Sequence, residues 1–133
     1  MSTATRLILR VVLTGAVFVA ALGGGASAAS AQSAPAVSVF PIPGDMVASP
    51  QTQIAFRGIP ANQIGTIQVT GSRSGTHTGV IRADSDGDGG SFIPNTPFTA
   101  GETVSVKTSL NVLEAAHYGT WHFAVASPSG TYP

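Results

Sequence analysis

The sequence predicts an all-β fold, a β-sandwich of about seven short strands preceded by a cleaved signal peptide. Three observations support this prediction. Beyond residue 36 the apolar residues recur at every second position, which is the spacing of a strand with one buried face. Turn-forming residues interrupt the alternation roughly every 10 residues. The first segment of the chain has the composition of an export signal.

Segment 1–31 predicts export by a Sec-type signal. Two arginines precede an apolar run of 12 residues at 11–22, and A-x-A cleavage sequences end at Ala28 and Ala31. The run is shorter than a membrane-spanning helix, which needs about 20 residues. No cysteine follows that could accept a lipid. We therefore expect a secreted, extracellular protein with no membrane span after cleavage.

The mature chain is the size of one domain, because removing 31 of the 133 residues leaves 102. We predict a flexible lead at 32–36, the sandwich at 37–128 and a C-terminal tail at 129–133. The chain has no cysteine, which excludes disulfides, thiolate zinc sites and cysteine nucleophiles. Four scattered cations remain against six acids, a net charge of −2, which excludes nucleic acid and anionic membrane surfaces as partners.

The first two strands are predicted from alternation and prolines. Segment 37–40 alternates, and the prolines of 41–44 end it. Segment 51–59 sends Ile54 and Phe56 to one face and polar residues to the other. One face of this strand is therefore buried and the other is wet.

The middle of the chain predicts a hairpin and a short strand. Segments 66–73 and 76–83 are joined by the turn pair Ser-Gly at 74–75. After an acidic stretch, segment 91–95 forms a short strand closed by Pro94.

The last strands have the clearest alternation, at 103–110 and 119–127. Their predicted inward residues are Val104, Val106, Thr108, Leu110, Trp121, Phe123 and Val125. Between them, segment 109–118 predicts a single helical turn. The aromatic residues Phe56, Phe92, Phe98, Trp121 and Phe123 belong to the core rather than to a carbohydrate-stacking platform, because a sandwich this small needs them inside. Tyr118 and Tyr132 are left for surface contacts.

Two phrases carry a family resemblance, SPQTQIAFRGIP at 49–60 and SFIPNTPFTAGETVSVKTSL followed by YGTWHFAVASP within 91–128. They resemble the bacterial Ig-like modules of surface-layer and other exported proteins. Segment 69–92 is similar to the N-terminal Ig-like domain of exported actinobacterial proteins related to arylsulfotransferases, which continue into a β-propeller. The resemblance covers roughly residues 37–128 and implies an immunoglobulin-like β-sandwich. Catalysis in those relatives belongs to the propeller, so no catalytic residue is carried over.

Three functions follow as hypotheses. The first is a secreted, non-catalytic Ig-like module that contacts another protein or a component of the cell envelope. The second is a truncated N-terminal accessory domain of an exported arylsulfotransferase-like enzyme. The third is a calcium-dependent adhesion domain. The sequence leaves the partner and the oligomeric state open.

The calcium hypothesis depends on Asp84, Asp86 and Asp88, which have the spacing that opens an EF-hand loop and are followed by Gly89. Position 12 of such a loop, which should supply a bidentate carboxylate, is Asn95. The stretch is therefore predicted as a hairpin tip, with the three aspartates as a weak calcium site. No other cofactor is expected.

The remaining chemical candidates predict no enzyme activity. His77, His117 and His122 lack the spacing of a metal pair, and we expect all three at the surface. The stretch GSRSG at 71–75 has Arg73 where a nucleophile elbow has serine, and no helix is predicted after it.

Overall fold

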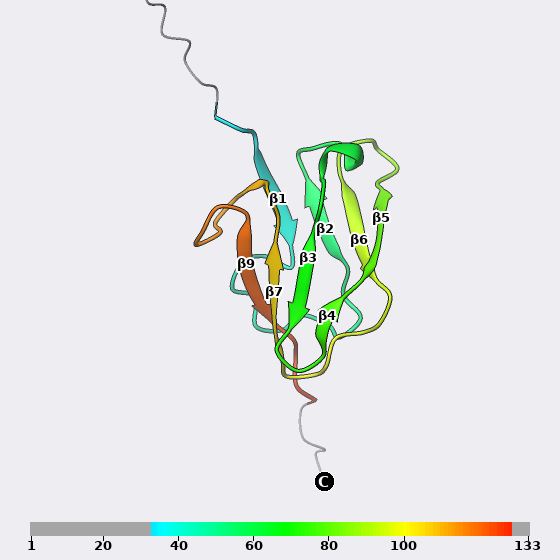
Figure 1. Cartoon of the computed structure of the whole chain (residues 1–133), viewed down its shortest axis with the longest axis vertical. Coiled ribbons are helices and arrows are strands. Elements are labelled where there is room, and N and C mark those ends of the chain that lie inside the picture. The colour runs from blue at the N-terminus through cyan, green and yellow to red at the C-terminus, as the bar shows by residue number, and fades with distance from the viewer. Residues whose placement is uncertain (1–32, 129–133) are drawn as a thin grey trace, which may run out of the picture. The chain divides into compact units, whose positions relative to one another are not determined.

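The computed structural model describes residues 33–128, which form two packed β-sheets (Figure 1). The larger sheet has the order β5-β6-β2-β1-β8 and the smaller has the order β4-β3-β7-β9. The strands are β1 (Ala36–Phe40), β2 (Ile54–Arg57), β3 (Gln68–Gly71), β4 (Gly75–His77), β5 (Gly79–Ala83), β6 (Gly90–Pro94), β7 (Thr103–Lys107), β8 (Asn111–Val112) and β9 (Thr120–Ala124). The predicted signal peptide 1–31 and tail 129–133 lie outside the described residues.

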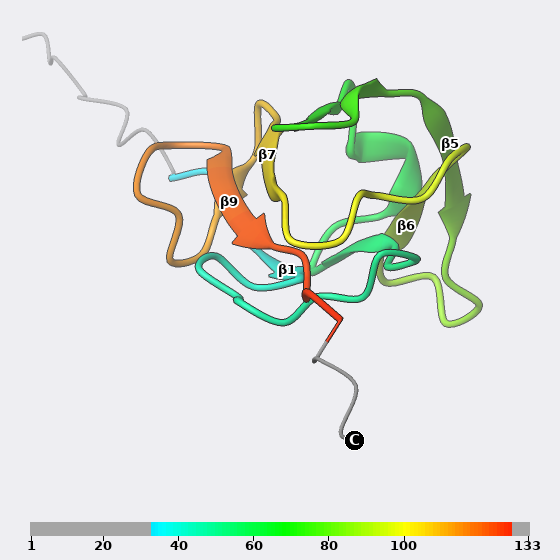
Figure 2. The same cartoon turned by 90° about the horizontal axis from the view of Figure 1, so that it is seen from below.

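The two sheets face each other (Figure 2), and the buried side chains of the core come from the strands of both. The predicted alternation is confirmed in β2, β7 and β9, whose buried residues stand at every second position. The core comprises Val37, Val39, Ala48, Ile54, Phe56, Ile59, Ile64, Val69, Phe92, Phe98, Val104, Val106, Leu110, Val112, Trp121, Phe123 and Val125. Thr108, which was predicted to face inward, is only partly buried.

The five aromatic residues predicted for the core are buried. Trp121 lies edge-on to Phe56 with ring centroids 6.0 Å apart, and Phe98 lies edge-on to Phe123 at 5.8 Å. The indole N–H of Trp121 donates to the carbonyl of Pro41 at 3.2 Å. The one polar atom of the buried indole is therefore paired, as burial requires.

The predicted strand 76–83 is two strands in different sheets. The chain leaves β4 at His77, crosses at Thr78 and enters β5 at Gly79. A Cβ at Gly79 would collide with the carbonyl oxygen of Ile93 on β6, so glycine is required where the chain joins the second sheet.

The helical turn predicted within 109–118 is wrong. This segment contains β8, which pairs in parallel with β1 through Ala36 with Asn111 and Val37 with Val112. Pairing with β1 satisfies backbone groups that a helical turn would otherwise have satisfied internally. Within residues 33–128 the helical turn is the 3-10 segment η2 (Ala61–Gln63).

The outer edge of β9 is covered by segment 44–48. The backbone N–H of Gly44 donates to the carbonyl of His122 at 2.8 Å, and that of Ala124 donates to the carbonyl of Asp45 at 2.6 Å. Ala48 forms an isolated parallel bridge with Val125. The edge of the smaller sheet at β9 is thus closed by the chain itself. No helix within residues 33–128 has the length and apolar character to cross a membrane.

Candidate functional site

The acidic stretch forms the tip of the hairpin that joins β5 and β6. The backbone N–H of Asp84 donates to the carbonyl of Gly89, and that of Gly87 donates to the carbonyl of Asp84, both at 3.0 Å. Gly89 has φ of 126°, and a Cβ there would collide with the carbonyl of Phe56. The predicted hairpin is therefore confirmed. Glycine is required at position 89 because φ is positive there and a side chain would collide with β2.

The three aspartates lie around the guanidinium of Arg57, which projects from the end of β2. Its Nη1 is 2.9 Å from Asp84 Oδ2, and its Nη2 is 2.6 Å from Asp86 Oδ2 and 3.7 Å from Asp88 Oδ2. The hydrogen bond from Arg57 lowers the pKa of Asp86 below its usual value. The spacing of the three aspartates predicts that they lie together, but no local pattern in the sequence indicates Arg57 as their counter-ion.

This arrangement provides fewer oxygen ligands than a calcium ion takes in proteins. Asn95 lies at the opposite end of β6, where its amide donates to Thr78 Oγ1 at 3.0 Å. Within residues 33–128, no group of three or more His, Cys, Asp or Glu residues is arranged to hold a metal ion. Calcium binding stays a prediction, and the ion would have to compete with Arg57 for the carboxylates.

A second polar cluster is buried between the turn after β3 and the turn before β7, and its centre is Glu102. The side chain is only 1% exposed. Its Oε2 accepts the backbone N–H groups of Arg73 at 2.8 Å and Ser74 at 2.9 Å. Its Oε1 accepts the backbone N–H of Thr99 at 2.7 Å and the hydroxyl of Ser74 at 2.6 Å. Each carboxylate oxygen therefore has two donors.

Hydrogen bonding keeps Glu102 ionised despite its burial. Burial acts to raise the pKa of Glu102, but the hydrogen bonds from Ser74, Thr99 and Arg73 outweigh it and lower the pKa to about 2. The carboxylate thus ties two turns together across 28 residues of chain. Sequence reasoning missed this residue, because a glutamate in a turn is normally exposed.

His77 belongs to the same cluster, so its predicted surface position is wrong. It is 5% exposed and packs against the ring of Phe98 with centroids 4.5 Å apart. Its Nε2 is 2.6 Å from Ser74 Oγ, and its Nδ1 is 3.3 Å from Thr96 Oγ1. His117 and His122 are exposed, as predicted.

The hydrogen-bond directions assign a structural role to this cluster. The Ser74 hydroxyl donates its proton to Glu102 Oε1, so the hydrogen bond between Ser74 and His77 is donated by His77 Nε2. A serine nucleophile needs the opposite arrangement, in which its hydroxyl donates to the histidine. The cluster therefore fixes two turns and has no activated nucleophile.

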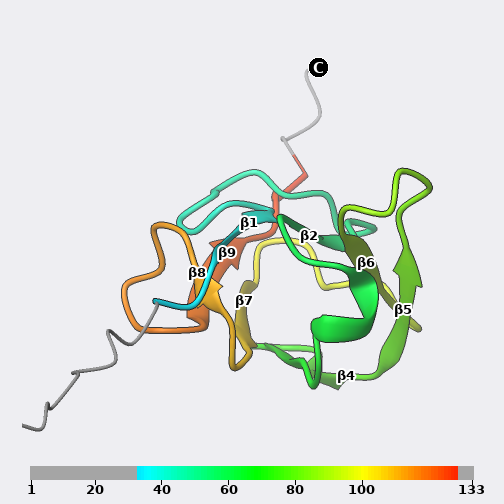
Figure 3. The ribbon, with the colours of Figure 1, turned by 90° about the horizontal axis from the view of Figure 1, so that it is seen from above.

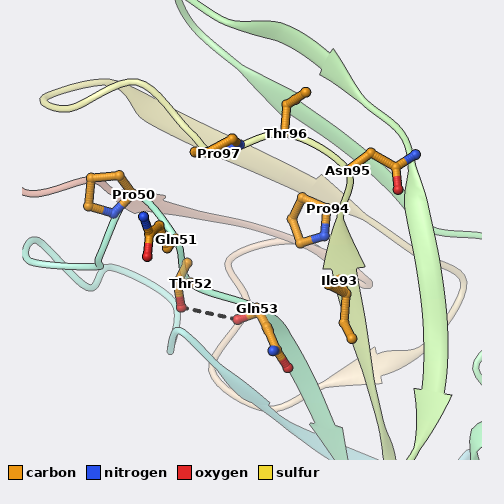
Figure 4. A pocket seen from close by; sticks show the side chains of 9 residues that line it. All are labelled: Pro50, Gln51, Thr52, Gln53, Ile93, Pro94, Asn95, Thr96 and Pro97. Carbon is orange, nitrogen blue, oxygen red and sulfur yellow. Dashed lines mark hydrogen bonds between the residues drawn. The ribbon is translucent and has the colours of Figure 1, made fainter.

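Surface depressions of the described residues range in volume from about 190 to about 660 Å³. One, of about 260 Å³, lies between segments 50–53 and 93–97 (Figure 4). Its lining consists of proline, isoleucine, threonine and side-chain amides, and Thr52 Oγ1 donates to the carbonyl of Gln53 at 3.1 Å. No acid or base lines this depression.

Exposed apolar side chains gather in one part of the chain. Phe40, Ile42, Met46 and Val47 are each more than half exposed. Leu113, at 47% exposure, lines a shallow groove with Ile42 beside β1. We call these five residues the 40–47 surface. The sequence does not distinguish these residues from core residues, because alternation alone does not tell which apolar side chains point outward.

No family model, curated protein or solved structure matches the chain. The two-sheet fold therefore rests on the structure, and the family resemblance stays a prediction.

Proposed function

We propose that the protein is an exported, non-catalytic Ig-like module that contacts another protein or a component of the cell envelope.

The strand order supports an Ig-like assignment. With letters given in chain order, β1, β2, β3, β4, β5, β6, β7 and β9 become A, B, C, C′, D, E, F and G. The sheets are then D-E-B-A and C′-C-F-G, with β8 added beside A. Immunoglobulin domains of the constant type have the sheets ABED and CFG.

Two features depart from antibody-type domains. The core tryptophan, Trp121, stands on the last strand rather than on strand C, and the chain has no cysteine for an inter-sheet disulfide. Both departures concern core packing rather than strand order. They are compatible with the broader group of sandwiches that share this architecture without sequence similarity.

The 40–47 surface is the observation that carries the proposed contact function. Four of its five residues come from eight consecutive positions, and each exposes more than half of its surface. Ile42 and Leu113 line the same groove, and clustered exposed apolar side chains mark interaction sites in soluble proteins. Met46 and Val47, at 72% and 76% exposure, contribute little to the core and are free to contact a partner.

The polar clusters support a non-catalytic reading. Arg57 forms ion pairs with the three aspartates at the hairpin tip, and Glu102, Ser74 and His77 join two turns. In each cluster the chemistry-bearing groups already have partners within the domain. Neither cluster lines the depression of Figure 4 with a titratable group.

The proposal is tested by capture from the producing cells. The tagged protein is incubated with culture supernatant and with envelope fractions, and bound material is identified by mass spectrometry. Replacing Met46 and Val47 by serine should weaken capture at least about tenfold, because exposed apolar anchors dominate such contacts. The control Lys107→Ser shortens an exposed side chain on β7, outside the 40–47 surface, and should leave capture unchanged.

Three results would replace the proposal. Capture that Met46→Ser/Val47→Ser leaves at the wild-type level would move the contact away from the 40–47 surface. Specific retention of a β-propeller protein would favour the accessory-domain hypothesis. Loss of capture on adding a calcium chelator would favour calcium-dependent adhesion through Asp84, Asp86 and Asp88.

A further inference from the structure

Strand β5 is an open sheet edge. It ends the larger sheet and pairs only with β6, and no other strand lies on its outer side (Figure 3). All five of its residues are at least partly exposed. Val80 is 50% exposed and Ile81 is 38% exposed, so both faces of the strand present apolar surface.

The backbone groups that point outward follow from the pairing with β6. Asn95 N–H donates to the Thr78 carbonyl at 2.8 Å, and Asp84 N–H donates to the Gly89 carbonyl at 3.0 Å. Hydrogen-bonded positions alternate along an antiparallel strand, so Val80 and Arg82 also bond to β6. The backbone N–H and C=O groups of Gly79, Ile81 and Ala83 therefore point away from the sheet.

The other sheet edges in residues 33–128 are closed or shorter. Segment 44–48 covers β9, β4 has three residues, and β8 has two. The edge of β5 has five residues and no proline, and its one charged residue is the exposed Arg82. An extended strand is the structure that satisfies three outward N–H and three outward C=O groups in a row.

We infer that β5 pairs in antiparallel fashion with β5 of a second copy, about a two-fold axis at Ile81. This register sets Gly79 opposite Ala83 and Ile81 opposite itself, so all outward backbone groups of both copies are paired. The two five-stranded sheets then become one continuous sheet. The association is separate from the 40–47 surface, which lies on other segments.

The side chains of β5 suit a second copy as the partner. On one face Ile81 meets Ile81 of the other copy, and the small residues Gly79 and Ala83 meet beside them. On the other face Val80 lies opposite Arg82, whose aliphatic stem covers it. The two-fold register places no like charges opposite each other, and such pairs would be destabilising.

A disulfide trap tests both the pairing and its register, since the chain has no cysteine of its own. In Ile81→Cys the two Cα atoms would be about 5.5 Å apart, which suits a disulfide. In the control Ala83→Cys the introduced residue faces Gly79, and the two cysteines are displaced by about 13 Å along the strand. Under mild oxidation Ile81→Cys should become a covalent dimer, and Ala83→Cys should stay monomeric. Equal rates of cross-linking in the two variants would overturn the inference.

A proline variant tests the same edge without oxidation. Ala83→Pro removes an outward N–H that β6 does not use, so the domain should keep its circular dichroism spectrum while the edge is blocked. Sedimentation over a concentration series should show the wild-type mass doubling and the Ala83→Pro mass unchanged. A wild-type protein that stays monomeric throughout, or a proline variant that still doubles in mass, would contradict pairing through β5.

Discussion

Replacing Glu102 by glutamine should destabilise the domain strongly at neutral pH. The carboxylate accepts four hydrogen bonds, two at each oxygen. A glutamine keeps one oxygen and turns an NH₂ group toward the other pair of donors, so two donors are left unpaired in a buried place. Each such loss costs about 1–3 kcal/mol, which gives a total of about 2–6 kcal/mol for Glu102→Gln.

The effect should depend on pH with a definite sign. Folding lowers the pKa of Glu102 from 4.5 to about 2, so its contribution is fully present above pH 4.5 and is lost as the pH falls toward 2. The shift corresponds to at most about 3 kcal/mol. The stability difference between wild type and Glu102→Gln should therefore be largest near neutral pH and shrink in acid.

The assay is urea unfolding followed by tryptophan fluorescence, run at about pH 7 and again at about pH 2.5. The matched control is Glu114→Gln, which changes an exposed glutamate and should shift stability by less than about 0.5 kcal/mol. A Glu102→Gln protein as stable as wild type at neutral pH would refute the role of Glu102 in joining the two turns. So would a stability difference that stays constant as the pH falls.

Four further variants probe the fold by thermal or urea unfolding, and one of them also by an NMR titration. Trp121→Ala removes the edge contact to Phe56 and the bond to Pro41, and should cost about 3–5 kcal/mol; unchanged stability would contradict its burial. Gly79→Ala sets a Cβ against the Ile93 carbonyl and should lower the melting temperature, whereas Gly87→Ala, where the space is open, tests positive φ alone. Arg57→Gln should change stability little, because the ion pairs are exposed, yet raise the pKa of Asp86 in an NMR titration.

The period-two alternation predicted the fold class and the inward residues of the strands at both ends of the domain. It worked there because a strand with one wet face must bury every second side chain. It failed at 76–83, because alternation does not reveal that a chain changes sheets. His77, which was predicted at the surface, lies on β4 opposite the buried Val69 and is itself buried.

The polar clusters were predicted only in part. Asp84, Asp86 and Asp88 are close in sequence, so their turn could be predicted, whereas Arg57 reaches them across 27 residues. Glu102 had a local signal that was overlooked: Thr99 and Glu102 have the spacing of a capping box, and the backbone N–H of Thr99 does bond to the glutamate. Its other donors come from Arg73 and Ser74, which only the fold brings near.

The pairing of β1 with β8 has a consequence for synthesis on the ribosome. Ala36 is bonded in register with Asn111, so the first strand cannot complete its hydrogen bonds until most of the chain has left the exit tunnel. Contacts this far apart in sequence close late and slow the folding of a domain. The hydrogen bonds of β1 should therefore form only after residue 112 has been synthesised and has left the tunnel, and until then the strand stays accessible to chaperones.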